Sequence, residues 1–198
     1  MRFVLASASP ARLATLTSAG VEPEVVVSGV DEDAITAATP AELVSALARV
    51  KAEVVAQALD GPALVLGCDS LLELDGGALG KPRTPAVAVE RWQALRGRTA
   101  VLHTGHHLID TSASRATTHT ASAQVRFADV TAAEIDAYVA TGEPLGVAGG
   151  FTIDGLGGWF VDGIDGDPHT VVGVSLPTLR GMLAELGRSL ADLGYPAR

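Results

Sequence analysis

The sequence contains a single cysteine and no apolar run long enough to cross a membrane. Cys68 has no second cysteine with which to form an internal disulfide, as is typical of a reducing compartment. A membrane-spanning helix needs about 20 mostly apolar residues, and the N-terminus lacks the charged region, apolar region and cleavage site of a secretory signal. These absences predict a cytoplasmic protein that does not associate with membranes.

Positive charge is also scarce. The 14 lysines and arginines are outnumbered by 23 aspartates and glutamates, and the net charge is -9. Proteins that bind nucleic acids usually present a basic face, so this balance argues against a nucleic-acid polymer as partner. A small anionic ligand is compatible with it where cations gather locally. Lysine occurs only as Lys51 and Lys81, and both stand beside segments with functional features.

Strand-like and helix-like patterns alternate along the chain. Apolar or β-branched runs predict strands over 3–5, 25–27, 63–66 and 159–161, a hairpin over 71–79, and mostly strand over 99–127. Capping boxes, prolines and apolar periodicity predict helices over 11–19, 40–58, 85–95, 132–141 and 177–186. The predicted class is α/β with a mixed central sheet flanked by helices. We expect residues 1–198 to form one domain of two lobes that share this sheet.

A stretch of small residues, Ser7-Ala8-Ser9-Pro10, separates the first predicted strand from the first predicted helix. Unpaired N–H groups and the positive end of the dipole at a helix N-terminus attract anions, and small side chains let an anion approach. Ser7 and Ser9 can donate hydroxyl hydrogen bonds, and Arg12 can hold a phosphate with two N–H groups. The alternative is a serine N-cap followed by a solvent-facing arginine.

Acidic residues follow two of the predicted strands. Asp69 comes after the buried strand predicted over 63–66. Ligands usually enter α/β sheets at the C-terminal ends of strands, where a carboxylate can hold a metal ion or orient water. Asp69 capping the next turn is the alternative. The cluster Asp31-Glu32-Asp33 is either a solvated turn or, with Asp69, part of a divalent-metal site.

Lys81 lies between a glycine and a proline at the end of the predicted hairpin. These neighbours restrict the backbone and would therefore aim the ammonium group. The segment is not a Walker A loop, because the long glycine-flanked spacing and the hydroxyl residue after the lysine are absent.

The histidines form only a weak zinc candidate. His103 and His107 share one face of the predicted strand, whereas His106 points away from them. No carboxylate flanks them in the sequence. His169 lies in a predicted polar turn, and we interpret it as structural or peripheral.

Six short motifs lie in order between Phe3 and Leu186. They are Ser-x-Ser-Pro-x-Arg at 7–12 and the segments 47–52, 67–70, 80–82, 148–151 and 155–158. Together they resemble the Maf (septum formation protein) family. The resemblance implies a nucleoside triphosphate pyrophosphatase that cuts between the α and β phosphates with a divalent cation, Mg²⁺ or Mn²⁺. It also implies an elongated two-lobed fold with a central cleft, related to the inosine-triphosphate pyrophosphatases, and a homodimer, which is common in that family.

The resemblance also implies roles for individual residues. Asp69 matches the catalytic carboxylate, which accepts a proton from the attacking water or holds the metal that activates it. Ser7 and Arg12 match the N-terminal phosphate loop. Lys51 and Lys81 match two lysines that neutralise the triphosphate and the charge developing on departing pyrophosphate. Glu32 aligns with an acidic residue that assists the metal.

The base-binding positions depart from one branch of the family. Members that prefer uridine and thymidine triphosphates carry an arginine, a threonine and a glutamine where this sequence has Ala11, Ser70 and Asp154. Val147 also replaces a lysine of that branch. Ionised Asp154 accepts hydrogen bonds but cannot donate them, so it suits an amino-bearing base edge better than glutamine does. The two triphosphates are therefore predicted not to be the preferred substrates.

The leading hypothesis is an enzyme that clears certain normal or modified nucleotides before polymerases incorporate them. One alternative is a nucleotide-binding regulator of cell division without catalysis, which would bind nucleotide without turnover. Another is a different α/β phosphatase that shares only these loops and releases orthophosphate. Separate measurement of pyrophosphate and orthophosphate distinguishes the three.

Overall fold

The computed structural model describes residues 1–196, in which strands and helices alternate. The elements are β1 (Arg2–Ala6), α1 (Pro10–Ser18), β2 (Glu24–Val25), α2 (Pro40–Ala58), β3 (Ala63–Leu74), β4 (Gly77–Leu79), α3 (Pro85–Leu95), β5 (Thr99–Asp110), β6 (Arg115–Phe127), α4 (Ala132–Ala140), β7 (Val161–Asp165), α5 (Pro168–Val172) and α6 (Leu176–Glu185). Short 3₁₀ turns connect some of them: η1 (Glu32–Ala34), η2 (Glu143–Gly146), η3 (Ala148–Gly150), η4 (Leu156–Phe160) and η5 (Leu190–Leu193). Within residues 1–196, no helix combines the length and apolarity that membrane crossing requires.

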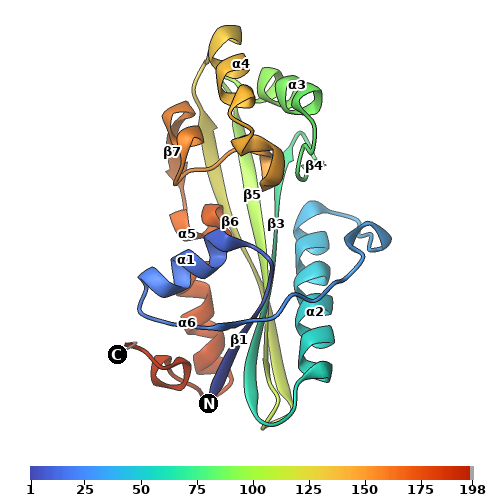
Figure 1. The fold of residues 1–198 in the computed structure, drawn as a ribbon, viewed down its shortest axis with the longest axis vertical. Helices are drawn as coiled ribbons and strands as arrows, with labels where there is room; N and C mark the ends of the chain where they lie inside the picture. The colour runs from blue at the N-terminus through green and yellow to red at the C-terminus, as the bar shows by residue number, and fades with distance from the viewer. Residues whose placement is uncertain (197–198) are drawn as a thin grey trace.

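The strands form one mixed seven-stranded sheet. Their order is β2-β1-β3-β5-β6-β7, and β4 pairs with the end of β3. Strand β1 is parallel to β2 and β3, whereas β5, β6 and β7 add in antiparallel fashion. Strands β3, β5 and β6 have 12, 12 and 13 residues, about twice the usual five to six. They run along most of the molecule's long axis (Figure 1), and the predicted mixed α/β class is confirmed.

Helix α2 lies directly against the sheet because two strand residues beneath it are glycine. A side chain at Gly67 would place its Cβ 2.1 Å from the backbone oxygen of Ala48. One at Gly105 would place its Cβ 2.2 Å from the backbone oxygen of Val44. Both distances lie far inside van der Waals contact, so only glycine permits this approach. The predicted capping box at Thr39 starts the helix.

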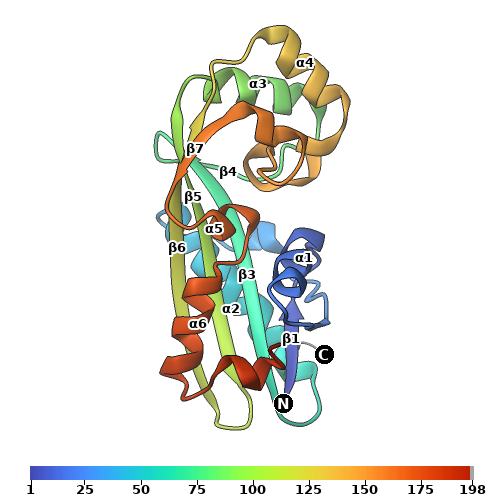
Figure 2. The same cartoon turned by 90° about the vertical axis from the view of Figure 1, so that its left-hand side faces the viewer.

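Buried apolar side chains gather at the two ends of the long strands. In one lobe, α3 and α4 pack on the sheet around Trp92, whose ring meets those of Phe127, Tyr138 and Phe160 at centroid distances of 5.6, 5.4 and 5.7 Å. In the other lobe, α1 and α6 cover one sheet face and α2 covers the opposite face. Figures 1 and 2 show the resulting elongated shape, with α3 and α4 at one end and α1, α2 and α6 towards the other.

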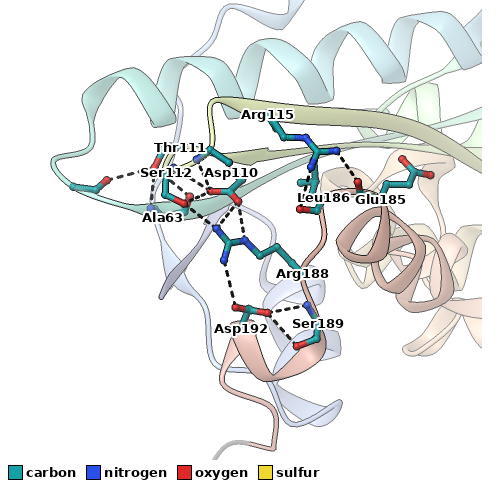
Figure 3. A network of polar contacts seen from close by, with 12 residues as sticks. Ala63, Asp110, Thr111, Ser112, Arg115, Glu185, Leu186, Arg188, Ser189 and Asp192 are labelled. Carbon is teal, nitrogen blue, oxygen red and sulfur yellow. Dashed lines mark hydrogen bonds and ion pairs between the residues drawn. The ribbon is translucent and has the colours of Figure 1, made fainter.

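An ion pair between the buried Asp110 and the half-buried Arg188 ties the segment after α6 to the sheet. Asp110, fully buried at the end of β5, accepts hydrogen bonds from Arg188 Nε at 2.7 Å and from the backbone and hydroxyl of Ser112 at 3.0 and 2.7 Å. Burial alone would raise the pKa of Asp110, but these donors and the Arg188 charge hold it below the ordinary value. Figure 3 shows Arg188 reaching from the segment after α6 to the β5–β6 turn.

The predicted end of the strand over 63–66, at Gly67, was wrong. Strand β3 continues without interruption to Leu74, because Gly67 serves the close packing of α2 and keeps its place in the ladder with β5. The Leu74–Gly77 turn that follows has positive φ angles of 53° at Asp75 and 80° at Gly76, as a two-residue type I′ hairpin requires. Asp69 therefore lies within a strand and not after one.

Two other strand predictions were wrong in their limits, and one helix was missed. The strand predicted over 159–161 starts only at Val161, because residues 156–160 form a 3₁₀ turn that leaves Trp159 86% exposed. The strand predicted over 25–27 is reduced to Glu24–Val25. The missed helix is α5, which has only five residues. Its N-cap residue is an aspartate, and an aspartate is equally common in a polar turn, so no signal in the sequence indicated a helix.

Candidate active site

A cavity of about 500 Å³ opens between the two lobes. Its walls come from the loop after β1, the segment around η1, α2, the middle of β3, residues 80–83 and the loop after η2. These segments are far apart in the sequence, and the sheet brings them together. Every predicted site residue lines the cavity: Ser7, Ser9, Ala11, Arg12, Glu32, Lys51, Asp69, Ser70, Lys81 and Asp154.

The cavity opens where β1 leaves the sheet. Ala6 pairs with Gly67 in the last register position between β1 and β3. The chain then turns away into the loop before α1, and β3 continues past it. Asp69 therefore lies two residues beyond the end of β1, beside the phosphate loop predicted over 7–10. The expected placement of Asp69 at the C-terminal end of its own strand is wrong, because β3 continues to Leu74.

Lys51 joins the two predicted acidic residues. Its ammonium nitrogen lies 2.6 Å from Asp69 Oδ1 and 2.5 Å from Glu32 Oε1. Lys51 and Asp69 are 7% and 8% exposed, so both charges are nearly removed from water. A buried charge is tolerated when it is paired, and here one cation serves two carboxylates. The three side chains come from α2, β3 and η1.

Positive charge keeps Glu32 ionised. Burial alone would raise the pKa of Glu32, but the hydrogen bond and charge of Lys51, then the charges of Lys81 and Arg12, hold the pKa below its ordinary value. Glu32 is thus within electrostatic reach of three of the predicted cations. The cavity gathers four cations, Arg12, Lys51, Lys81 and Arg83, in a chain whose overall charge is negative, and four carboxylates line it as well.

Arg12 is built into the cavity wall. Its Nε donates to the backbone oxygen of Gly173 at 2.8 Å, and its terminal nitrogens donate to the hydroxyls of Ser7 and Ser70 at 3.0 Å each. Ser70 Oγ also shares a 2.9 Å hydrogen bond with Thr104 Oγ1. Arg12 therefore fixes the loop after β1 to β3 and to the segment after α5, with its charge at the wall.

Ser9 fulfils the alternative proposed for it from the sequence. Its side chain accepts a hydrogen bond from the backbone N–H of Arg12 and N-caps α1. Its own N–H donates to Ser7 Oγ at 3.1 Å. A capping role does not remove Ser9 from the cavity, since the residue also lines it.

Asp69 and Glu32 present oxygen ligands that suit Mg²⁺ or Mn²⁺. Their convergence on the Lys51 ammonium shows that one cation can contact both carboxylates. Among residues 1–196, no group of three or more histidine, cysteine, aspartate or glutamate side chains is placed to hold a metal. A magnesium ion is commonly held by one or two carboxylates together with substrate phosphates, so the residues fit a metal that arrives with a phosphate ligand.

A family model described as Maf-like protein matches residues 2–186. The chain belongs to the Maf family. Proteins named nucleoside triphosphate pyrophosphatase from Streptomyces coelicolor and Thermosynechococcus vestitus are 57% and 56% identical to it. The first comparison covers 99% of this chain and 96% of the relative, and the second covers 96% of each. The Ham1 protein of Staphylococcus aureus superposes with a TM-score of 0.43 at 18% identity, over 65% of this chain and 73% of that one.

The sequence did not indicate two polar residues of this Maf-family site. Arg83 and Thr152 line the cavity. Arg83 has a left-handed backbone, with φ of 65°, and its N–H donates to the backbone oxygen of Leu145 at 3.0 Å. Its position beside Lys81 was the available signal, but a left-handed arginine cannot be recognised from residue type. Thr152 carried no signal apart from its place in a glycine-rich segment.

The histidines of this Maf-family chain lie apart from the cavity. His103 bonds Ser122 at 2.7 Å and Glu73 at 2.9 Å, and His107 bonds Thr118 at 2.6 Å. No carboxylate flanks them in the sequence, but the pairing of β3 with β5 places Glu73 beside His103. His106 faces the other side of the sheet, where burial lowers its pKa to about 4.

Proposed function

We propose that this chain is a nucleoside triphosphate pyrophosphatase, which hydrolyses the α–β anhydride and releases a nucleoside monophosphate and pyrophosphate. The observation that carries the proposal is the meeting of Lys51, Asp69 and Glu32 in a cavity that Lys81 also lines. This reaction needs cations that neutralise the triphosphate and carboxylates that orient the attacking water. The names of its Maf-family relatives support the same activity.

The triphosphate would bind along the positive side of the cavity. The loop at Ser7 leads into α1, whose N-terminal N–H groups attract an anion. Arg12 holds that loop in place. Lys81 is exposed at the cavity and free to meet a phosphate oxygen as ligand enters. Lys51 and Lys81 would then stabilise the charge that builds up as pyrophosphate leaves.

Asp69 would orient the attacking water. Its Oδ1 accepts the hydrogen bond of Lys51, and its Oδ2 is the atom that we assign to receive the proton of the water. The water oxygen bonds to a phosphorus of the anhydride, and the bridging P–O bond breaks. Asp69 and Glu32 would hold Mg²⁺ or Mn²⁺, which when bound supplies Lewis-acid polarisation of phosphate oxygens.

The far wall of the cavity would receive the base. Val147 and Asp154 line it, while Ala11 lines the cavity from α1. Asp154 offers only acceptor atoms while ionised. A base with an amino edge therefore suits this wall better than uracil or thymine. Ser70 also lines the cavity, where its hydroxyl bonds Arg12 and Thr104.

A substrate panel tests the function. With Mg²⁺ or Mn²⁺, we expect release of pyrophosphate and nucleoside monophosphate, and we expect uridine and thymidine triphosphates to be poorer substrates than cytidine, guanosine or methylated nucleotides. Orthophosphate as the first product would identify a different phosphatase. Binding without turnover would favour a regulatory protein.

The variant Asp69→Asn tests the assigned mechanism. We expect its kcat to fall about 10³-fold while nucleotide binding persists, because the amide cannot accept the proton. Asp136→Asn, an exposed position on α4 outside the cavity lining, is the matched control and should keep the kcat within about twofold. Wild-type turnover in Asp69→Asn would contradict the mechanism.

The cellular setting and the assembly stay predictions. An enzyme that clears nucleotides would work in the cytoplasm, where polymerases draw on the nucleotide pool. A homodimer follows from the family resemblance alone. Sedimentation of the full chain at micromolar concentration measures the assembly directly.

A further inference from the structure

One carboxylate fastens the loop that forms the far wall of the cavity. Residues Phe151–Gly155 lie between the 3₁₀ turns η3 and η4 and have no regular structure. The Glu143 side chain nevertheless accepts hydrogen bonds from both ends of this loop. Thr152 Oγ1 donates to its Oε1. The backbone N–H groups of Gly157 and Leu156 donate to Oε1 and Oε2, each at 3.0 Å.

A fourth donor anchors Glu143 to the lobe beneath. Tyr138, in α4, donates its hydroxyl hydrogen to Glu143 Oε1 at 2.9 Å. Tyr138 is buried, and its ring packs against those of Trp92 and Phe160. The carboxylate therefore connects the loop to the most tightly packed part of this lobe. Separately, Trp92 Nε1 donates to the backbone oxygen of Gly150 at 2.9 Å and fixes the loop's start.

The glycines of the loop make this convergence sterically feasible. A Cβ at Gly157 would lie 2.6 Å from the Tyr138 hydroxyl oxygen, and one at Gly155 would lie 2.8 Å from Glu143 Oε2. Any larger residue would push the donors away from the carboxylate. The glycines of the motif at 155–158 therefore leave the space in which these donors reach Glu143.

The four donors keep Glu143 ionised. Burial alone would raise its pKa, but the hydrogen bonds from Thr152, Leu156, Gly157 and Tyr138 hold the pKa below the ordinary value. An ionised carboxylate makes stronger hydrogen bonds than a neutral amide. The loop is thus held by charge-assisted bonds at both ends.

Between these ends, Ile153 and Asp154 form the tip of the loop and line the cavity. Glu143 is not among the described residues that line it. A substrate would therefore meet the tip and not the carboxylate. Asp154 is exposed, so its direction depends on how the loop is held at each end.

We propose that Glu143 is a positioning residue that fixes Ile153 and Asp154 and thereby sets which nucleobase the cavity accepts. The inference rests on the proposed function, in which this wall receives the base. Phosphate binding uses Lys51, Lys81 and the loop after β1, whereas the groups bonded to Glu143 are Tyr138, Thr152, Leu156 and Gly157. Phosphate binding should therefore be independent of Glu143.

Binding measurements on Glu143→Gln separate the two halves of the ligand. Dissociation constants are measured for α,β-methylene analogues of ATP, GTP, CTP and UTP, and for inorganic tripolyphosphate, which has no base. The glutamine amide would point its N–H₂ group at some of the groups that now donate hydrogen bonds to Glu143. The variant therefore loses at least one charge-assisted hydrogen bond. We expect the ratio between the weakest and the tightest analogue to shrink about tenfold. The tripolyphosphate constant should stay within about twofold.

Two further variants control the result. Glu185→Gln changes another carboxylate that accepts hydrogen bonds, from Thr117 and His119 at a distance from the cavity, and should leave every constant unchanged. Tyr138→Phe removes a single donor and should shrink the selectivity ratio about threefold. If Glu143→Gln does not fold, the selectivity ratio of Tyr138→Phe tests the proposal instead.

Unchanged selectivity in a folded Glu143→Gln or in Tyr138→Phe would overturn the proposal. Equal weakening of all analogues and of tripolyphosphate would also overturn it, because a merely structural role predicts that result. Because binding is measured without turnover, the positioning role of Glu143 can be refuted while the pyrophosphatase activity stands, and the reverse. A wild-type chain that binds selectively but hydrolyses nothing would refute the pyrophosphatase activity and still test Glu143.

Discussion

A lysine on the buried face of a helix marks the centre of the site. The inward face of α2 carries Val44, Leu47, Ala48, Ala52 and Val55, all buried and small or apolar. Lys51 occupies the same face and breaks this pattern. Removing an ammonium group from water costs several kcal/mol unless carboxylates compensate. The pairing with Asp69 and Glu32 provides that compensation, so the break in the pattern reflects the site and not a defect of the core.

Replacement of Lys51 by methionine should slow catalysis and change its pH dependence. The charge opposite the triphosphate is lost, so we expect kcat to fall about 10²–10³-fold. Lys51 lowers the pKa of Glu32, so without Lys51 that pKa rises and Glu32 becomes protonated at a higher pH. The acid limb of the pH–kcat profile should therefore move upward. Lys51→Arg keeps the positive charge and should shift the acid limb of the profile much less. An acid limb that does not move in Lys51→Met would contradict the prediction.

The position of α2 decides whether the charged residues meet. Its glycine contacts at β3 and β5 bring its backbone onto the sheet, and Lys51 projects from this helix toward Asp69, two residues along β3 from Gly67. A helix displaced by the width of one methyl group would carry Lys51 with it. The site geometry is therefore a property of helix–sheet packing as much as of the site residues.

Gly67→Ala should disturb stability and activity together. Its Cβ would lie 2.1 Å from a backbone oxygen, so we expect the free energy of unfolding to fall by about 3 kcal/mol and kcat to fall with it. Gly181→Ala is the control: in α6 this residue is exposed, and, apart from its own helix backbone and chain neighbours, a Cβ would meet none of the described atoms within 4 Å. It should stabilise the protein by about 0.5–1 kcal/mol. Denaturant unfolding measures both, and a neutral Gly67→Ala would refute the packing argument.

At the scale of the molecule, three long strands connect two separately packed lobes. Figure 1 shows these strands running from one lobe to the other, and the cavity lies between the lobes. The ion pair of Arg188 with Asp110 (Figure 3) lies at the distal end of one lobe. The segment after α6 contributes Arg188 to this pair, and its contact with Asp110 closes the end of the sheet. This ion pair therefore lies at one end of the long strands, whereas Asp69 and the cavity that it lines lie along their middle.

Asp110→Asn should destabilise the protein in a pH-dependent way. At pH 7 we expect the free energy of unfolding to fall by about 2 kcal/mol, because Arg188 loses a buried charged partner. The pKa of Asp110 is lowered by folding, so its contribution is full above the unfolded value of 3.8 and is lost as the pH falls through the folded value. The difference between variant and wild type should therefore shrink below about pH 4.

An exposed pair provides the contrast for this prediction. Arg2 and Glu24 also make a close ion pair, at 2.8 Å, but their side chains are 44% and 48% exposed. Glu24→Gln should change the free energy of unfolding by less than about 1 kcal/mol at pH 7. Urea unfolding at pH 7 and pH 3 tests both variants, and equal losses in the two would contradict the role of burial.

The sequence by itself determined the class of the fold, most helix limits and a set of candidate site residues that share one cavity. Local signals are sufficient for helices such as α2, because its capping box and apolar periodicity involve neighbours in the chain. The family motifs identified residues that all line one cavity, among them Asp69 and Lys51. Their catalytic roles stay predictions until the variants are measured.

Only the tertiary structure decided where strands end and how the side chains meet. Gly67 resembles a strand terminator in sequence, but the helix that packs on it comes from a distant segment and keeps it inside β3. The pairing of Lys51 with Asp69 and Glu32, and the convergence of both ends of a loop on Glu143, join residues that share no local pattern. Such contacts depend on the approach of remote segments, which residue type and spacing along the chain do not specify.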